Sequence, residues 1–317
     1  MLTVIFATRN RSRTLPTVLD AFAHLQPPSG GWKLVIVDNG STDRTREVIA
    51  SFQARLPLTY IFEGSAGKNI AINAALAHLE GDLAVFTDDD VFPYPDWLIR
   101  LRTAADAQPE YSIFGGAVRP RWQVPPPNWI QWVNTQVAYA ISGPEMVEGP
   151  TKPWFIFGPN MAIRTAVFKE GTRFSTSIGP RGNSYPMGSE TELTLRLDRQ
   201  GHRCWHTRDA VVEHFIEEHQ MTKSWVLGRA IRFGRGSFRL EQTPDVVGVP
   251  RFRGIPVNLF TRLFRKGVRS LIALLSFNEQ ALLYNLWQFN YFRGNIIEAH
   301  MIYRERQQAN DVDRNGH

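Results

Sequence analysis

Apolar and polar residues alternate in two different periods over the first ninety positions of the chain. Short apolar runs rich in β-branched residues lie at 2–8, 33–39, 58–63 and 82–88. Between these runs, apolar residues at spacings of three and four lie in the segments 12–25, 41–53 and 67–79. The first pattern is typical of strands, and the second is typical of helices that pack on one side. Their alternation predicts an α/β fold with a mostly parallel sheet flanked by helices.

Polar residues follow each of the four predicted strands. They are Thr8-Arg9-Asn10, Asp38-Asn39, Glu63-Gly64 and Asp88-Asp89-Asp90. Ligands of open α/β sheets bind at the carboxyl ends of the strands. The four polar ends therefore predict one shared crevice.

The pattern becomes less regular after about residue 110. Two further strands and one helix are predicted, at 112–122, 209–215 and 189–201. The helix begins with Ser189 and carries Glu192 three residues later, which resembles a capping box. The segment before it is rich in Gly, Pro and Ser, so residues 177–188 are expected to form a mobile loop.

Composition narrows the classes of ligand. The chain has 317 residues, of which 43% are hydrophobic, so it can bury a sizeable core. Lys and Arg exceed Asp and Glu by only six, which gives no indication of a nucleic-acid partner. This excess suits a polyphosphate ligand or an anionic membrane surface. The single cysteine, Cys204, excludes an internal disulfide and a zinc site built from cysteines.

The expected location is cytoplasmic. The first ten residues, MLTVIFATRN, lack the basic start of a signal peptide. No segment approaches the roughly 18 apolar residues that span a bilayer. Peripheral association with the inner face of a membrane stays open as an alternative to a fully soluble protein.

Three consecutive carboxylates, Asp88, Asp89 and Asp90, need a physical explanation. Two unit charges roughly 5 Å apart repel by about 3 kcal/mol at an effective dielectric constant near 20. A divalent cation would remove this penalty, and so would an exposed acidic turn. In an extended segment Asp88 and Asp90 point to one side and Asp89 to the other. Carboxylate oxygens suit Mg²⁺ or Mn²⁺, and the position after a buried strand favours the metal.

Six segments in this order resemble the motifs of the family 2 glycosyltransferases, which have the GT-A fold. They are VIFATRNR, LVIVDNGSTDRT, AGKNIAINAAL, VFTDDDVFPYPDWL, FGPNMAIRTAVF, and GSETELTLRL followed by AVVEHF. The resemblance covers roughly residues 1–220 and implies a nucleotide-binding half at 1–90 and an acceptor half at 91–220. It implies an inverting enzyme that uses a nucleotide-diphosphate sugar and a divalent metal.

The resemblance assigns residues to the nucleotide. Asp38 would accept a hydrogen bond from the base, usually uracil, although a turn acid is the alternative. Thr8 and Arg11 would border the nucleoside, or serve the turn alone. Lys68 stands where the family usually has Arg and would contact the base or the phosphates, but it lacks the bidentate guanidinium group. Asp88 would contact the ribose or the water shell of the metal.

The same resemblance assigns a metal site. Asp90 would bind Mn²⁺ or Mg²⁺ and, through the ion, the diphosphate. His214 matches a family histidine that follows a late strand and reaches the metal or the diphosphate. A structural role is the alternative for a lone histidine at a strand end.

The general base is expected just before the predicted helix at 189–201. Many family members have Gly-Glu-Asp at this point, whereas this chain has Gly188-Ser189-Glu190. Glu190 would replace the aspartate and take the proton of the acceptor hydroxyl. Glu192 is the alternative carboxylate, but it lies about 200° further around the helix. Both acids could instead serve the helix N-terminus.

The acceptor and the donor sugar are expected to lie near the FGPN turn. Trp154 and Asn160 flank this turn, and an aromatic face suits a sugar ring. The alternative is that these residues belong to the core. Arg181, in the predicted loop, would help to neutralise the leaving diphosphate.

The last part of the chain, 221–317, is predicted to be a helical, basic extension. Residues 258–275 form an amphipathic helix with four basic residues on one face and an apolar stripe. The stripe consists of Phe260, Phe264, Val268, Leu271 and Leu275. This helix would either dock on an anionic membrane surface, or pack on the catalytic domain with its basic side in water.

We therefore expect a metal-dependent glycosyltransferase that moves a sugar from a UDP-linked donor to a glycan or a lipid-linked acceptor. Two alternatives are kept. A sugar nucleotidyltransferase would need a Gly-rich phosphate loop after the first strand, and ATRNRSRTL has no glycine. A non-catalytic sugar-nucleotide sensor or scaffold is compatible with Ser189-Glu190 in place of the usual Glu-Asp.

Overall fold

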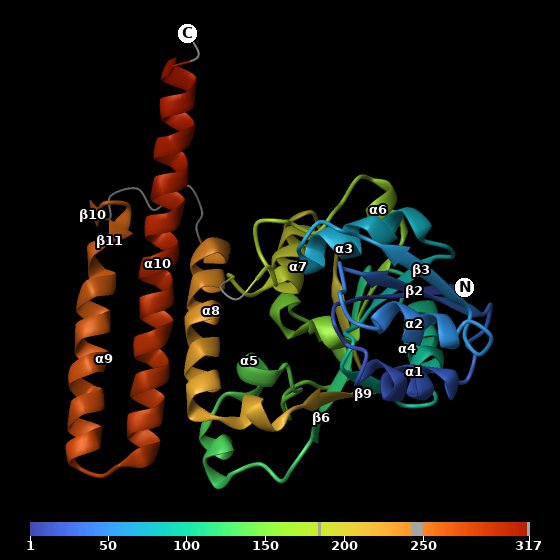
Figure 1. The fold of residues 1–317 in the computed structure, drawn as a ribbon, viewed down its shortest axis with the longest axis horizontal. Coiled ribbons are helices and arrows are strands. Elements are labelled where there is room, and N and C mark those ends of the chain that lie inside the picture. The colour runs from blue at the N-terminus through green and yellow to red at the C-terminus, as the bar shows by residue number, and fades with distance from the viewer. Residues whose placement is uncertain (183–184, 242–249, 316–317) are drawn as a thin grey trace. The chain divides into compact units, whose positions relative to one another are not determined.

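A computed structural model describes residues 1–182, 185–241 and 250–315 of the chain. The chain divides into two compact units (Figure 1). The sheet unit comprises Met1–Gln123, Tyr139–Gly182 and Ser189–Ile216. The helical unit comprises Val124–Ala138, Asn183–Gly188 and Glu217–His317.

The sheet unit contains a mixed nine-stranded sheet. The strand order is β3 (Leu58–Phe62), β2 (Trp32–Asp38), β1 (Leu2–Thr8), β4 (Leu83–Phe86), β8 (Met161–Arg164), β6 (Ile113–Trp122), β9 (Cys204–Ile216) and β5 (Val91–Pro93), and β7 (Gly149–Thr151) also pairs with β9. The first four strands along the chain are parallel, and β6 is parallel to β9. Strands β5, β7 and β8 run antiparallel to their neighbours. The α/β fold expected from the sequence is confirmed.

Strand alternation creates two separate cores. In β1, Leu2, Val4 and Phe6 belong to one core, whereas Ile5 belongs to the other. The first core is shared with α1 (Leu15–Ala23), α2 (Thr45–Ser51) and α4 (Trp97–Ala107). The second core is shared with α3 (Lys68–Ala75), η1 (Leu76–His78), α6 (Ala166–Lys169) and α7 (Ser189–Arg199). Because side chains alternate with a period of two, a sheet with both faces covered reads as continuous apolar runs.

Two local expectations are corrected. Strand β4 ends at Phe86, so the three aspartates lie in a turn between β4 and β5 rather than at the end of a longer strand. The short strand β5 was not foreseen. Ser189 is the first helical residue of α7, and the carboxylate of Glu192 accepts hydrogen bonds from Arg196. The expected capping box is therefore wrong.

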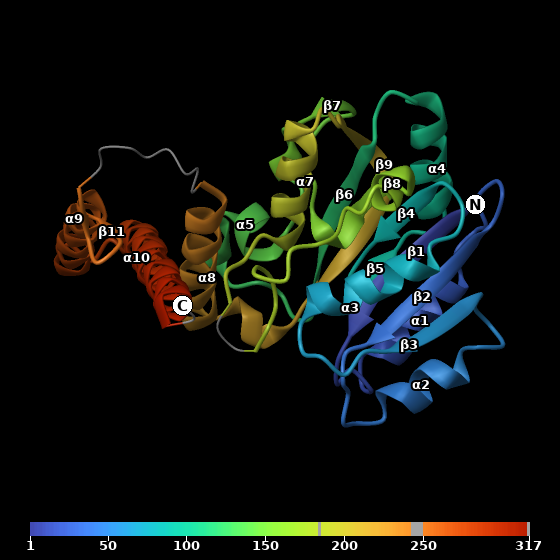
Figure 2. The same ribbon diagram turned by 90° about the horizontal axis from the view of Figure 1, so that it is seen from above.

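The helical unit is built on one long helix. It contains η2 (Asn128–Trp132), η5 (Glu218–Met221), α8 (Lys223–Glu241), β10 (Arg251–Phe252), β11 (Ile255–Pro256), α9 (Val257–Leu275) and α10 (Glu279–Asn315). Both α8 and α9 pack on α10, which lies between them (Figures 1 and 2). A Cβ on Gly234 would lie 2.0 Å from the carbonyl oxygen of Tyr291, so these two helices approach as closely as glycine allows.

A buried ion-pair network joins α8 to α10. Glu298 is fully buried, and its Oε2 atom accepts a hydrogen bond from Arg235 Nε at 2.7 Å. Its Oε1 atom accepts from Arg239 Nε. In the part of the chain that the structure describes, no helix is long and apolar enough to cross a membrane.

Candidate active site

Lys68 joins two carboxylates that lie far apart in the sequence. Its Nζ atom donates hydrogen bonds to Asp88 Oδ1 at 2.6 Å and to Glu190 Oε1 at 3.0 Å. Burial acts to lower the pKa of Lys68, but the charges of Asp88 and Glu190 outweigh burial and raise that pKa above its ordinary value. Lys68 therefore stays charged. It holds Glu190, the predicted general base, beside Asp88, which is predicted to contact the nucleotide.

The start of α3 fixes the position of Lys68. The preceding residue, Gly67, has a φ of 143°, which favours glycine. Its N–H donates to Asn39 Oδ1 at 2.9 Å, and Asn39 directly follows β2. The N–H of Lys68 donates to the carbonyl oxygen of Pro180 at 3.0 Å. The polar end of one strand thus positions the helix that carries the cation.

Glu190 lies against the main chain of the FGPN turn. This turn contains η4 (Gly158–Asn160), and a Cβ on Gly158 would lie 2.6 Å from the carboxyl carbon of Glu190. Any side chain at position 158 would displace the carboxylate. The sequence offered no signal for this contact, because the two residues come from separate motifs.

Asp90 and His214 face each other. The N–H of Phe215 donates to the carbonyl oxygen of Asp90 at 2.8 Å, which fixes the turn against β9. His214 Nε2 then lies 3.5 Å from Asp90 Oδ1. Burial opposes charge on both groups, yet their attraction raises the pKa of His214 and, with Arg11, lowers the pKa of Asp90.

A main-chain carbonyl orients the histidine ring. His214 Nδ1 lies 2.7 Å from the carbonyl oxygen of Tyr139, which can only accept a hydrogen bond. In the neutral ring the proton therefore lies on Nδ1, and the Nε2 lone pair points toward Asp90. This is the arrangement in which metal-binding histidines are commonly held.

The atoms of Asp90 and His214 fit a divalent ion. Asp90 Oδ1 is buried, and no residue in the described ranges donates a hydrogen bond to it. Its 3.5 Å separation from His214 Nε2 is close to that of adjacent octahedral ligands with bonds of roughly 2.1 Å, which is about 3 Å. No cluster of three or more His, Cys, Asp or Glu residues that could hold an ion occurs among the described residues. An ion here would take further oxygens from substrate and water.

Arg11 bridges Asp89 and Asp90. Its Nε atom lies 3.4 Å from Asp89 Oδ1, and Nη2 lies 3.7 Å from Asp90 Oδ2. Asp89 and Asp90 thus share one cation, and the orientation of Asp89 away from the metal-diphosphate site stays a prediction. Burial, only partly offset by Arg11, raises the pKa of Asp89 to about 6. Each of the three carboxylates thus lies next to a cation. Asp89 and Asp90 share the guanidinium of Arg11, and Asp88 pairs with Lys68.

Asp38 is buried at the end of β2, where it pairs in register with Thr8 of β1. Its Oδ1 accepts the N–H of Ser41 at 2.8 Å, and its Oδ2 accepts the hydroxyl of Tyr60 at 3.1 Å. Sequence reasoning missed Tyr60, because it lies inside β3 rather than at its polar end. The two bonds fix the plane of the Asp38 carboxylate.

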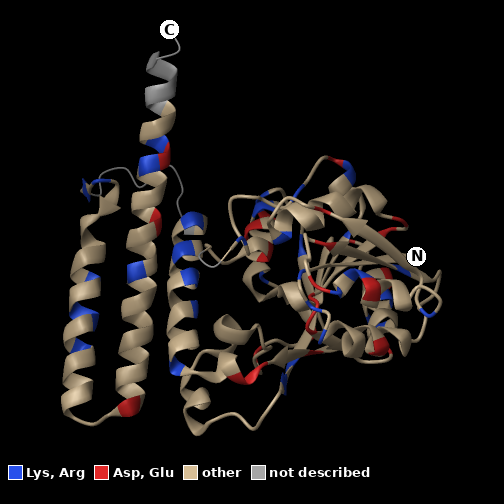
Figure 3. Cartoon of the chain, viewed as in Figure 1, with Lys and Arg blue, Asp and Glu red and all other residues tan. Residues whose placement is uncertain are grey.

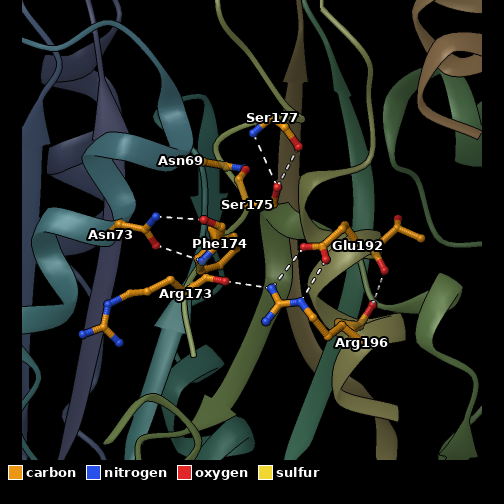
Figure 4. A network of polar contacts seen from close by, with 10 residues as sticks. Asn69, Asn73, Arg173, Phe174, Ser175, Ser177, Glu192 and Arg196 are labelled. Atoms are coloured by element: carbon orange, nitrogen blue, oxygen red, sulfur yellow. Dashed lines mark hydrogen bonds and ion pairs between the residues drawn. The ribbon is translucent and has the colours of Figure 1, made fainter. Parts of the chain in front are cut away.

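A separate network holds α3 and α7 in place (Figure 4). Asn73 of α3 pairs with the main chain of Phe174, and the Glu192 carboxylate of α7 binds Arg196 at 2.9 and 3.1 Å. The same guanidinium donates to the carbonyl oxygen of Arg173 at 2.7 Å. Glu192 is thus engaged in this network, whereas Glu190 pairs with Lys68.

Trp154 lies on the surface of the sheet unit. It belongs to η3 (Pro153–Phe155), and 48% of its surface is exposed. Lys152 Nζ lies 5.1 Å from the centre of its ring. An exposed aromatic face of this kind can stack on a sugar ring.

Asn160 is fully buried and has a positioning role. Its amide nitrogen donates to the carbonyl oxygens of Ala117 at 2.9 Å and Ala210 at 2.8 Å. Its side-chain oxygen accepts the indole N–H of Trp97 at 2.9 Å. Both amide hydrogens are used, so the structure does not bring Asn160 to the surface near Trp154. It instead fixes the FGPN turn to β6, β9 and α4.

Arg181 is exposed at the end of the described segment 1–182. Residues 183–184 of the expected loop 177–188 lie outside the described residues. Gly179 in this loop has a φ of 99°, and a Cβ there would lie 2.0 Å from Ser189 Oγ. The described part of the loop therefore packs directly on the start of α7.

Comparison with solved structures identifies the fold class. Mannosyltransferase PcManGT from Pyrobaculum calidifontis, in complex with GDP-Man and Mn²⁺, superposes with a TM-score of 0.63 at 19% identity, covering 94% of this chain and 86% of that one. S. aureus TarS 1–349 in complex with UDP-GlcNAc gives a TM-score of 0.54 at 14% identity, covering 97% and 92%. These likenesses establish a GT-A-like fold.

The sequence then places the chain in one family. Residues 3–172 match the model of glycosyl transferase family 2, and the chain belongs to this family. Succinoglycan biosynthesis protein ExoM from Rhizobium meliloti is 23% identical over 235 residues, which is 74% of this chain and 72% of ExoM. Glucosyl-dolichyl phosphate glucuronosyltransferase from Haloferax volcanii is 25% identical over 154 residues, which is 47% of this chain and 48% of that enzyme. The chain is thus a glycosyltransferase that uses a nucleotide-sugar donor, and the resemblance noted in the sequence is confirmed.

Proposed function

We propose that the chain is a metal-dependent, inverting glycosyltransferase with Glu190 as its general base. The observation that carries this proposal is the contact of Lys68 with both Asp88 and Glu190. It brings a carboxylate of the acceptor half beside the aspartates that follow β4. A base must lie next to the donor for a single displacement to occur.

The chemistry is one in-line displacement. Glu190 takes the proton of the acceptor hydroxyl as the hydroxyl oxygen forms its bond to the anomeric carbon. The bond from that carbon to the donor phosphate oxygen breaks, and its electron pair leaves with the nucleoside diphosphate. Because one displacement occurs, the anomeric configuration inverts.

Lys68 determines when Glu190 can act. In the structure described, Lys68 Nζ is 3.0 Å from Glu190 and competes with an acceptor hydroxyl for the same carboxylate. The diphosphate of a bound donor is a stronger partner for an ammonium group. We propose that Lys68 turns toward the diphosphate and thereby frees Glu190.

Asp90 and His214 are the proposed ligands of Mn²⁺ or Mg²⁺. When bound, such an ion neutralises charge on the leaving diphosphate. Arg11, which lies beside Asp89 and Asp90, adds positive charge at the same edge of the sheet. Asp88 is the proposed partner of the ribose.

Uracil is the proposed base. Each oxygen of Asp38 already accepts one hydrogen bond, from Ser41 and from Tyr60. A carboxylate oxygen has two lone pairs, so one acceptor position is left on each. The single imide N–H of uracil needs one of them, so the two bonds that Asp38 already accepts are compatible with this base. Thr8, at the end of the neighbouring strand, is proposed to border the nucleoside.

The acceptor is proposed to be a hydroxyl of a glycan or of a lipid-linked glycan. The names of two relatives support this class, because one acts in succinoglycan biosynthesis and the other on a dolichyl phosphate glucoside. Trp154 is the proposed stacking surface for a sugar. We further propose that residues 1–220 form the transferase domain, that 221–317 form an extension, and that the protein acts in the cytoplasm.

Donor turnover tests this proposal. The full chain is incubated with UDP- and GDP-sugars and Mn²⁺, and release of nucleoside diphosphate is measured. Glu190→Gln should reduce release by about a hundredfold or more, because a lost general base typically lowers the rate by that factor. Glu192→Gln is the matched control and should change release little. Equal losses in the two variants, or turnover of GDP-sugars only, would contradict the assignment of the base or of the nucleotide.

A further inference from the structure

The apolar stripe of α9 faces solvent. Its members Phe260, Phe264, Val268, Leu271 and Leu275 are between 40% and 72% exposed. The helix packs on α10 through its opposite side, where Leu259, Ser270 and Ala273 are buried. The stripe predicted from the sequence is thus not the packing face of this helix.

The turn after α9 extends the apolar surface. Phe277 is 92% exposed and has a φ of 54°, an unusual conformation for an aromatic residue. Ile272 and Leu274 of the last helical turn are 59% and 56% exposed. Exposed apolar residues in this number mark an interaction surface rather than ordinary surface composition.

The same segment carries a concentrated positive charge. Residues 250–278 contain no Asp or Glu and six basic residues, which are Arg251, Arg253, Arg262, Arg265, Lys266 and Arg269. This local excess equals the net charge of the whole chain, +6. Figure 3 shows basic positions along α9 without acidic ones. The positive and negative residues of the remaining sequence are therefore equal in number.

The basic residues of α9 lie on one side of the helix, between the stripe and the side that packs on α10. Arg262 lies over the ring of Phe292, and Lys266 lies over the ring of Tyr284, so these two side chains reach toward α10. Arg265 and Arg269 are exposed, and no described carboxylate lies within ion-pair distance of either. Arg265 projects about 100° and Arg269 about 140° from the middle of the stripe, on the side of the exposed Ile272.

We propose that α9 and the following turn dock on an anionic lipid surface, with Phe264, Leu271 and Phe277 in the interfacial region and Arg265 and Arg269 at the lipid phosphates. An apolar face bordered by cations is the arrangement of helices that lie in the membrane interface. A second copy of the chain is disfavoured, because a two-fold contact through this face would pair two surfaces of the same positive charge. This proposal does not depend on the transfer reaction proposed above.

Vesicle binding tests the proposal. The full chain is sedimented with vesicles of phosphatidylcholine alone and with vesicles that also contain phosphatidylglycerol. Binding is expected only to the anionic vesicles, and it should weaken as salt is raised. Failure to bind the anionic vesicles, or equal binding to both kinds, would overturn the proposal.

Variants identify the surface. The double variant Arg265→Gln/Arg269→Gln should bind anionic vesicles about thirtyfold more weakly, since each charge near the surface contributes about a fivefold factor. Phe264→Ser should bind about tenfold more weakly. The double variant Arg199→Gln/Arg208→Gln removes the same charge from exposed arginines of the sheet unit and should bind as the original does. Equal losses in the two double variants would mean that net charge, not α9, drives binding.

A probe at the turn measures insertion directly. The variant Phe277→Cys can be labelled selectively with an environment-sensitive fluorophore, because Cys204 is buried and burial raises the pKa of its thiol to about 12. The emission should shift to shorter wavelength with anionic vesicles. No shift would exclude insertion of the turn. Sedimentation equilibrium supplies the last outcome, since a dimer dispersed by Phe264→Ser, without vesicle binding, would assign the face to a second copy.

Discussion

A single lysine joins the proposed general base to one of the three consecutive aspartates. Lys68 Nζ reaches both Asp88 and Glu190, which a compact ammonium group can do from any direction. A guanidinium in the same place would favour a planar pairing with one carboxylate. A lysine in place of the arginine usual in the family therefore suits the exchange of partners that we propose for this residue when the donor binds.

Tyr60 is a positioning residue for Asp38. In Tyr60→Phe the hydroxyl that donates to Asp38 Oδ2 is lost, so the carboxylate is less firmly oriented. UDP affinity in the presence of Mn²⁺, measured by calorimetry, should fall about fivefold, the equivalent of about 1 kcal/mol for one hydrogen bond. The preference for UDP over GDP should also decrease.

Tyr94→Phe is the matched control for this substitution. Its hydroxyl lies 3.5 Å from Glu213 and makes no contact with Asp38. Unchanged UDP affinity in Tyr60→Phe, or an equal loss in Tyr94→Phe, would show that the hydroxyl of Tyr60 does not position Asp38.

At the residue scale, the sequence identified candidate site residues but not the residues that they contact. The rule that ligands bind at strand ends singled out Asp38, Asp88 and Asp90 without any coordinates. It could not identify Tyr60 or the contact of Gly158 with Glu190, because each depends on segments that meet only after folding. The role of Asn160 was missed for the same reason, since its three partners come from three different elements.

At the scale of elements, α8 and α10 are joined by ion pairs to a fully buried carboxylate. Glu298 is fully buried between Arg235 and Arg239. A buried ion pair adds little net stability compared with apolar residues, but removal of one partner leaves the others uncompensated. Helical periodicity gave no sign of this, because the pair joins residues about sixty positions apart.

Glu298→Gln should therefore lower the free energy of unfolding by about 3 kcal/mol, as is typical for a broken buried pair. Chemical denaturation followed by circular dichroism measures this change. Glu305→Gln is the control, because Glu305 pairs with the same Arg239 but is 56% exposed. It should change the stability by less than about 1 kcal/mol. Similar effects of the two substitutions would show that burial of the charge is not what matters.

The amphipathic pattern of α9 was correct as a pattern but did not reveal which face is packed. Apolar spacing predicts a stripe, and in most globular proteins the stripe is the buried side. Here the side with Ser270 and Ala273 is buried instead, since small residues let α9 lie close to α10. A sequence pattern records polarity, whereas packing also depends on the size and shape of the partner.

At the scale of the whole molecule, the two units are interleaved along the chain. Segments 124–138 and 183–188 are grouped with the C-terminal helices, although both are flanked by parts of the sheet unit. No shift in composition marked these segments. Periodicity alone indicates a boundary near residue 220, but it does not show that segments 124–138 and 183–188 belong to the helical unit.

We expect the two units to bind different ligands. In hydrogen exchange of the full chain, UDP with Mn²⁺ should slow exchange in peptides that contain Asp38, Asp88 to Asp90 and Glu190. Anionic vesicles should slow exchange in peptides within 257–278, because binding lowers the local opening of the segment it covers. Protection of the same peptides by both ligands would contradict separate sites.

The hydrogen bond from His214 to the carbonyl of Tyr139 has a consequence for mutational scanning. The partner is main chain, so it is present whatever side chain stands at 139. Alanine at that position would report only the loss of the Tyr139 ring, which packs on Trp122 at 5.5 Å. The neighbouring Ala140 has a φ of 54°, and this backbone geometry sets the direction of the carbonyl. Scans and sequence variation alike would therefore undervalue a segment whose contribution is conformational, and backbone amide-to-ester replacement would be needed to reveal it.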